Sequence, residues 1–283
     1  MEKRSIRASE LGRDRNFAMQ VEQAQQPLTP STSHRQLVQA LRSKQKTSKG
    51  ASAYARFLNR PAGRHLAALA YKLHMTPNGV TAVSALCSFS GIGLIAFAPA
   101  TPVISVLVAL LLVLGYALDS ADGQLARLRG GGSFAGEWLD HVVDAVKMAS
   151  LHLAVLVAWY QGYVERGAWL AIPLLYQLLA VVLFFAIILT DQMRRAHRGS
   201  TSTRLAGEGS SSVLYSLAVL PTEYGVLCLA FFLWSIPPVF SVVYAVFFGI
   251  NACFFLLALP RWYGEMRSYG AADAAQAAPP AEL

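Results

Sequence analysis

The sequence predicts an all-α, polytopic membrane protein with six transmembrane helices, preceded by an amphipathic helix at the membrane surface. Hydrophobic residues make up 54% of the 283 residues and charged residues only 14%, whereas a soluble domain contains about 25% charged residues. Apolar segments of about 20 residues, the length that crosses a bilayer, recur from Val80 onward. The positive charge precedes them, because residues 1–80 hold 14 of the 24 Lys and Arg residues and 4 of the 16 Asp and Glu residues.

The N-terminal part of the chain divides into two segments. Residues 1–50 are rich in Gln, Ser, Thr and charge and lack a long apolar run, so we expect them to be disordered. Residues 51–78 place apolar residues at helical spacing with Arg and Lys between them, which predicts an amphipathic juxtamembrane helix. Basic segments beside membrane spans favour anionic lipid headgroups, so we interpret this charge as a membrane-surface feature and expect no nucleic-acid partner.

Residues 79–264 are expected to form the six-helix transmembrane catalytic domain. We place the spans near residues 80–99, 102–119, 135–161, 168–190, 211–234 and 237–260. The connections after the second and fourth spans and the segment after the sixth are basic, and the other connections are nearly neutral. Because basic loops stay in the cytoplasm, we expect both termini there. Residues 265–283 are expected to form a loose tail.

The third predicted span is too polar for a simple anchor. It contains six ionisable side chains, Glu137, Asp140, His141, Asp144, Lys147 and His152. Such groups are costly at membrane depth unless they face a bundle interior or a wet cavity, so they mark a functional site. The three cysteines lie in separate apolar runs without a ligand spacing, which excludes a disulfide framework and a cysteine-based zinc site.

Two pairs of carboxylates flank a glycine-rich connection. Asp119 and Asp122 are three residues apart, and Asp140 and Asp144 are four apart, so each pair lies on one face of its helix. The glycines at 130–132 let the two helices return antiparallel, which would gather four carboxylates at the cytoplasmic end. Such a cluster needs cations, and oxygen ligands suit two Mg²⁺ or Mn²⁺ ions that clamp phosphates. The alternative is that the pairs merely cap helix ends in solvent.

These residues fit one pattern with fixed spacing, D-x2-D-G-x2-A-R-x8-G-x3-D-x3-D. Its fixed positions are Asp119, Asp122, Gly123, Ala126, Arg127, Gly136, Asp140 and Asp144. The pattern resembles the signature of the CDP-alcohol phosphatidyltransferases, with every fixed residue and spacing present. The wider similarity covers roughly residues 52–262 and includes an element at Thr76-Pro77-Asn78 that often precedes the first span of that family.

The resemblance implies transfer of a phosphatidyl or related phospho-alcohol group from a CDP-linked donor to an acceptor hydroxyl, with release of CMP, in phospholipid biosynthesis. It also implies a homodimer. By position, Asp119, Asp122 and Asp140 would hold the metal ions. Asp144 would be a ligand of the second ion, the base for the acceptor hydroxyl, or both. The resemblance places Gly123, Ala126 and Gly136 in the cytidine pocket and Arg127 at the donor phosphates.

Basic residues on the third span and after the fourth span are candidates for binding the acceptor. Lys147, one turn beyond Asp144, would either offset the carboxylates or meet an acceptor phosphate. Arg194, Arg195 and Arg198 end the fourth span, where they either signal topology or bind a phosphorylated polyol such as inositol phosphate or glycerol 3-phosphate. Arg204 in the following loop is a further candidate.

Three alternative functions follow from the same residues. The expected donor is CDP-diacylglycerol, and the first alternative is a transferase that uses a non-diacylglycerol CDP-alcohol. A divalent-cation transporter would also need carboxylates within a bundle, but they should then line a full pathway. A catalytically dead scaffold would not need the intact pattern. The sequence therefore favours a membrane enzyme whose active site faces the cytoplasm.

Overall fold

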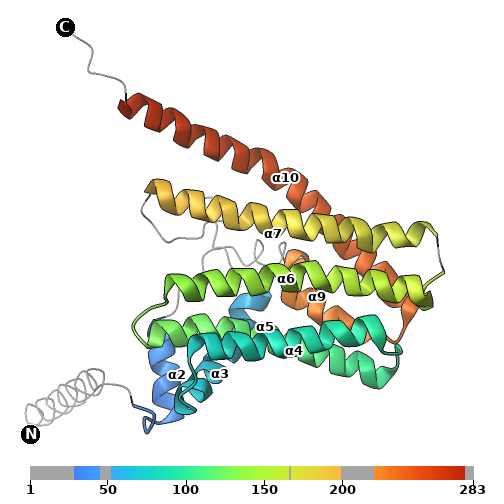
Figure 1. The fold of residues 1–283 in the computed structure, drawn as a ribbon, viewed down its shortest axis with the longest axis horizontal. Coiled ribbons are helices and arrows are strands. Elements are labelled where there is room, and N and C mark those ends of the chain that lie inside the picture. The colour runs from blue at the N-terminus through green and yellow to red at the C-terminus, as the bar shows by residue number, and fades with distance from the viewer. Residues whose placement is uncertain (1–28, 45–51, 166, 199–219, 278–283) are drawn as a thin grey trace, which may run out of the picture.

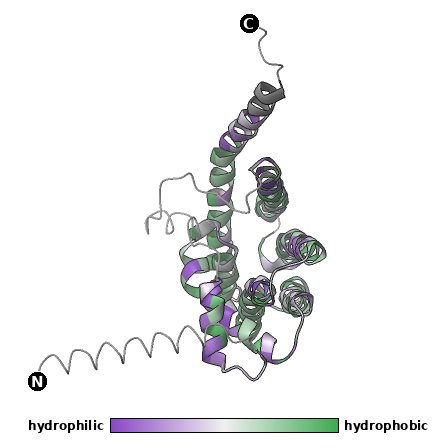
Figure 2. Ribbon diagram, turned by 90° about the vertical axis from the view of Figure 1, so that its left-hand side faces the viewer, coloured by the Kyte–Doolittle hydropathy of each residue, from purple (hydrophilic) through white to green (hydrophobic). Residues whose placement is uncertain are grey.

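The computed structural model describes residues 29–44, 52–165, 167–198 and 220–277. These residues form helices and contain no strand, which confirms the all-α class. Five of the described helices are long and apolar enough to cross a membrane. They are α4 (Pro77–Phe97), α5 (Pro102–Leu128), α6 (Phe134–Ala158), α7 (Ala171–Arg198) and α10 (Pro237–Ala277). Figure 2 shows that the long helices are mainly hydrophobic.

The predicted fifth span differs from the other five. Its described part is a shorter apolar helix, Tyr224–Leu233, made of α9 (Tyr224–Ala230) and a 3₁₀ turn. A second 3₁₀ turn at Leu220–Thr222 precedes α9, and residues 211–219 lie outside the described ranges. The sixth membrane crossing therefore stays a prediction.

The helices around the carboxylates begin at hydroxyl residues. Thr76, Thr101 and Ser133 precede α4, α5 and α6, and each side chain accepts a hydrogen bond from the backbone N–H three residues later. A side-chain oxygen at this position satisfies one of the backbone donors that the first helical turn leaves unpaired. Proline follows both threonines, where its missing N–H costs nothing. These caps fix where each helix starts relative to its acidic residues.

The connection between α5 and α6 is the glycine turn that the sequence predicts. Gly130 and Gly131 have φ angles of +105° and +134°, which side chains rarely adopt. Their N–H groups donate back to the carbonyls of Arg127 and Ala126, at 3.3 and 3.0 Å, and end α5. The helix thus continues past residue 119, where we expected the second span to end, so both of its aspartates lie within regular helix.

Contacts join the helices in the order α3, α5, α4, α6, α7 and α10. Figure 1 shows α4, α6 and α7 running side by side. α4 packs against both α5 and α6, whereas the backbones of α5 and α6 have few close contacts with each other. The main core joins α4 to α7 with α9 and α10, and its largest fully buried side chains include Trp159, Trp234, Tyr244, Phe231 and Phe240. The arrangement leaves the acidic faces of α5 and α6 separated by a gap that their side chains bridge.

The N-terminal helices cover one side of α5. A π-helical turn at Ala55–Asn59 leads into α3 (Arg60–Lys72). α3 packs against α5 through a row of buried small residues and exposes Leu69 and Leu73, the amphipathic pattern that the sequence predicts. Pro61 lies in the first turn of α3, where a proline fits.

Two segments that we expected to lack structure contain helix where the structure describes them, so the expectation of disorder is wrong for His34–Ser43 and that of a loose tail is wrong up to Ala277. α2 (His34–Ser43) lies within residues 1–50. Ser33 and Gln36 form a reciprocal cap at its start, and Leu37 and Leu41 are buried against α3 and α5. Two leucines are too weak a signal to predict a helix from the sequence. A helix as short as α2 is stable only through its tertiary contacts. At the other terminus, α10 continues to residue 277 instead of loosening at 265.

Candidate active site

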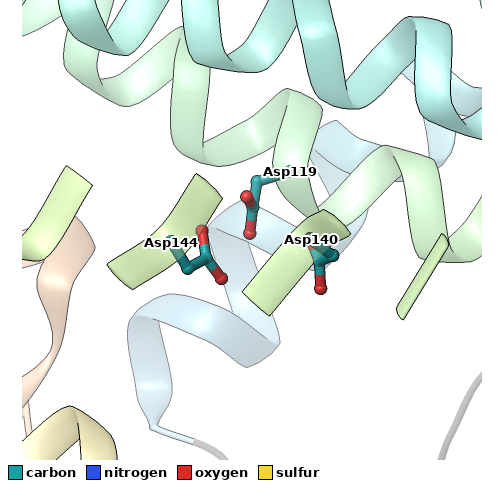
Figure 3. A group of neighbouring side chains, drawn as sticks. All are labelled: Asp119, Asp140 and Asp144. Atoms are coloured by element: carbon teal, nitrogen blue, oxygen red, sulfur yellow. The ribbon is translucent and has the colours of Figure 1, made fainter. Parts of the chain in front are cut away.

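Three of the four predicted carboxylates meet between α5 and α6. Carboxylate oxygens of Asp119, Asp140 and Asp144 all lie within 4.8 Å of one another. Figure 3 shows Asp119 reaching from α5 towards Asp140 and Asp144 on α6. Each of the three residues is partly buried, so their mutual repulsion is screened less than it would be in open solvent. The antiparallel return of the two helices brings these residues together as the sequence predicts.

The fourth carboxylate, Asp122, lies beside this group, but its side chain contacts a different helix, α4. It is only 6% exposed, and its Oδ2 accepts a hydrogen bond of 2.6 Å from Thr81 Oγ1 on α4. It remains close enough to Asp119 and Asp140 for the carboxylates to repel one another. α4 therefore orients one carboxylate of the pattern directly.

Lys147 joins the two acidic helices. Its ammonium group contacts Asp119 Oδ1 across the gap and lies 2.7 Å from Asp144 Oδ1 on its own helix. The Lys147 side chain is only 3% exposed. The position matches the first of its two expected roles, since the charge offsets the carboxylates.

The residues expected at the donor nucleotide lie at the same end of the bundle. Gly123 follows Asp122, and a Cβ at this position would lie 3.4 Å from a guanidinium nitrogen of Arg127. A Cβ on Gly136, at the start of α6, would lie 3.2 Å from Asn78 Oδ1 on α4. Ala126 is buried, while Arg127 is partly buried. Gly136 therefore brings the backbone of α6 close to the start of α4.

The predicted arginine cluster is already paired with carboxylates. Arg194 makes a two-pronged contact with Glu265 on α10, at 2.9 and 2.6 Å. Arg195 contacts Glu137 on α6 and lies 2.8 Å from Asp191 on its own helix. These pairs connect α7 to both of its neighbours. The side chain of Arg198 and all of Arg204 lie outside the described part of the chain.

A pocket of about 930 Å³ lies between α6 and α7. Its apolar wall consists of Phe134, Trp138, Val142, Ala145, Met148, Val181, Phe184, Phe185, Ile188 and Ala196. Its polar residues are Glu137, His141, Gln192 and Arg195, and the two on α6 flank Asp140 in the sequence. The pocket thus runs along apolar helix surface from a polar region next to the acidic group.

Side chains near Asp119 that the sequence did not predict as part of the site come from α5, from the start of α9 and from the segment before α3. Tyr116, one turn earlier on α5, donates a hydrogen bond of 2.5 Å to Glu223, which precedes α9. Tyr54 stacks on Tyr116 with ring centroids 6.1 Å apart, and burial raises the pKa of Tyr54 to about 12. A Cβ on Gly225 would lie 2.0 Å from the Tyr54 ring, so only glycine lets α9 approach this closely.

Neither the Tyr116–Glu223 contact nor the Thr81–Asp122 contact has a strong signal in the sequence. Glu223 stands out as a carboxylate within an apolar segment, but its partner lies 107 residues away. Thr81 falls four residues after Pro77, at the start of the second turn of α4, and only the packing of α4 on α5 identifies its acceptor.

The comparisons with known proteins identify one family. The model of the CDP-alcohol phosphatidyltransferase family matches residues 74–260, which contain every carboxylate, glycine and arginine described above as part of the fixed pattern. No curated protein shows significant similarity to the chain.

Proposed function

Because the chain belongs to the CDP-alcohol phosphatidyltransferase family, we propose that it transfers a phosphatidyl group from CDP-diacylglycerol to an acceptor hydroxyl, with release of CMP. The family consists of transferases of substituted phosphate groups, is generally metal-dependent and acts in phospholipid synthesis. The apolar helices agree with an integral membrane enzyme. The observation that carries the specific proposal is the group formed by Asp119, Asp140 and Asp144 at one end of the bundle.

The chemistry of the acidic group fits Mg²⁺ or Mn²⁺. All of its ligand atoms are carboxylate oxygens, the ligands that these ions prefer. Oxygens on opposite sides of one Mg²⁺ are separated by about 4 Å, so a spread of 4.8 Å closes with small side-chain movements. We propose two ions, held by Asp119, Asp122, Asp140 and Asp144. When bound, they would neutralise the donor diphosphate and the charge that develops on the leaving CMP.

Asp144 is the proposed base. The acceptor oxygen would form a bond to the phosphorus of the phosphatidyl group, while the bond from that phosphorus to the CMP oxygen breaks. Asp144 would take the proton of the acceptor hydroxyl. The position of Asp144 beside Asp119 and Asp140 supports this role, because a metal ion held there would lower the pKa of a hydroxyl bound next to it.

We propose that the donor nucleotide binds where α4, α5 and α6 meet. Gly123, Ala126 and Gly136 would let the cytidine approach the backbone, and Arg127 would contact the donor phosphates. The pocket between α6 and α7 favours a lipid donor over a soluble CDP-alcohol, because most of its wall is apolar and its polar end lies next to the acidic group.

The proposed acceptor is a phosphorylated polyol. Arg195 supports this choice, since its guanidinium lies at the polar end of the pocket. Arg194 offers less support, because it is not among the residues that line the pocket and its Nε and Nη2 are bound by Glu265. The ends of α5 and α7 carry Arg127, Arg129, Arg194 and Arg195, so we propose that the active site faces the cytoplasm. A homodimer is proposed from the family alone.

An assay of CMP release tests the function and separates the two donor classes. Purified full-length protein is given Mg²⁺ and either CDP-diacylglycerol or CDP-glycerol, together with a panel of labelled acceptors. We expect CMP release with CDP-diacylglycerol, a lipid product of the matching mass, and loss of both in Asp140→Asn or after EDTA. Release with CDP-glycerol alone would establish the non-diacylglycerol alternative. Failure of both donors with every acceptor would contradict the proposal.

A further inference from the structure

Lys147 occupies a position that the proposed chemistry leaves unexplained. Its ammonium group lies between Asp119 on α5 and Asp144 on α6. These are two of the three carboxylates that gather close enough to share an ion. A cation of the protein itself thus contacts two of the proposed metal ligands.

The surroundings of Lys147 hold the ammonium group in place. The side chain is 3% exposed, so the charge has little access to water and depends on its carboxylate partners. Other titratable groups near this cluster are Tyr116 on α5, Asp140 on α6, and Tyr224 and Cys228 on α9. None of these four supplies positive charge, so Lys147 is the cation that the described residues place against Asp119 and Asp144.

We propose that the Lys147 ammonium competes with a divalent ion for Asp119 and Asp144, so that the protein without substrate binds one divalent ion fewer than its carboxylates could hold. This inference rests on the proposed function, because it assigns Lys147 a role toward the metal ions of that site. A second ion that binds these two carboxylates must displace the ammonium and sits close to its charge, which opposes binding. The flexible four-carbon side chain of lysine allows this displacement.

Because of this competition, binding of the second divalent ion depends on the donor substrate. The diphosphate of a CDP-linked donor adds negative charge beside the carboxylates, which compensates for having both the ammonium and a second divalent ion in the same site. Lys147 is therefore a positioning residue that delays full metal loading until the donor is present. Without Lys147, the carboxylates would bind the second divalent ion even when no donor is present.

Titration with Mn²⁺ tests this role without any turnover. Full-length wild type, Lys147→Met and the matched control Lys72→Met are purified in the same detergent without nucleotide, and free Mn²⁺ is followed by electron paramagnetic resonance. We expect one bound Mn²⁺ per wild-type chain and a second in Lys147→Met, with affinity at least about ten-fold higher than that of any second wild-type site, because a unit charge near a divalent ion has been removed. Lys72, at the end of α3 and away from the carboxylates, should leave binding unchanged.

A second measurement separates metal competition from a purely structural ion pair. Lys147→Met leaves two carboxylates without their cation, which lowers its Tm. If the lysine competes with metal, Mn²⁺ raises the Tm of Lys147→Met more than that of wild type, and adding Asp144→Asn abolishes the gain. Equal or weaker Mn²⁺ binding by Lys147→Met, with no larger Tm increase, overturns the inference. CMP release by the wild type would still support the proposed function in that case, so the two failures are distinguishable.

Discussion

Asp122 and Asp144 are the same kind of side chain in two different surroundings. Asp122 is almost fully buried and accepts a hydrogen bond from Thr81, whereas Asp144 is more exposed and contacts Lys147. The hydroxyl of Thr81 orients Asp122 without placing a competing positive charge beside it, whereas Asp144, with a side chain 23% exposed, has more access to water. The difference in surroundings therefore supports a division of labour between metal binding and proton transfer.

The proposed role of Asp144 as the base predicts a selective loss of turnover. Asp144→Asn cannot accept the proton of the acceptor hydroxyl, so we expect kcat to fall by about 100-fold or more. Binding of CDP-diacylglycerol in the presence of Mn²⁺ should persist, because the other carboxylates remain. Steady-state CMP release and equilibrium donor binding, measured on the same preparation, check both parts. A variant with near-normal kcat would assign the base elsewhere.

The Thr81 hydroxyl is expected to matter because Asp122 has so little access to water. Thr81→Val keeps the shape but removes the donor of the 2.6 Å hydrogen bond. An unsatisfied buried acceptor costs about 1–3 kcal/mol, so the Tm should fall and the Mg²⁺ concentration for half-maximal activity should rise. Thr81→Ser retains the hydroxyl and serves as the control. Identical Mg²⁺ dependence in all three proteins would show that Thr81 does not orient Asp122 for metal.

At the scale of helices, the turn between α5 and α6 determines whether the acidic faces meet. The sequence predicts this hairpin well, because positive φ angles require glycine and the aspartate spacings define one face per helix. It does not predict the end of α5, since hydropathy drops at Asp119 while the backbone continues to Leu128. The helix ends where backbone hydrogen bonding ends, and apolar length alone gives no signal for that.

Partners across helices were beyond prediction for a related reason. Arg194 and Glu265 are 71 residues apart. Helical periodicity predicts contacts only between residues three or four apart, so it cannot identify this pair. Their pairing depends on how α7 and α10 are rotated about their own axes. The same holds for Lys147, whose contact to Asp144 follows from the spacing of α6 while its contact to Asp119 requires the tertiary fold.

The glycine turn gives a prediction whose matched control, Gly132, is the next residue after Gly131. Gly131→Ala places a side chain at φ +134°, a conformation that costs about 1–3 kcal/mol. Gly132 lies in open space without a positive φ, so Gly132→Ala should be nearly neutral. Thermal unfolding in detergent measures the difference. If both variants had the wild-type Tm, the turn would not constrain the hairpin.

At the scale of the whole molecule, charged contacts at one end hold together helices that are otherwise apolar. Arg195 connects α7 to Glu137 on α6, and Arg194 connects α7 to Glu265 on α10. His197 stacks on Tyr269 at 4.3 Å next to the second pair. The arginines therefore organise the bundle end that contains the acidic group, in addition to any contact with an acceptor.

Replacing Arg194 and replacing Arg195 should have different effects on stability and on the acceptor KM. Arg194→Ala removes the cation that pairs with Glu265 and leaves it the hydrogen bond from Tyr269, so we expect a loss of about 1–3 kcal/mol of stability and an unchanged acceptor KM. Arg195→Ala should raise the acceptor KM more than the donor KM. Charge exchange, Arg194→Glu with Glu265→Arg, should restore much of the lost Tm. A raised acceptor KM in Arg194→Ala would instead place both guanidinium groups in the acceptor pocket.

The length of α10 has a practical consequence. Its 41 residues extend over about 60 Å, twice the hydrocarbon thickness of a bilayer. The C-terminal part of α10 thus projects beyond the lipid while the Arg194–Glu265 pair anchors it to α7 (Figure 1). A small folded domain fused in helical phase near residue 277 would be carried rigidly by the enzyme. It would serve as a fiducial for electron microscopy of a protein otherwise hidden in its micelle.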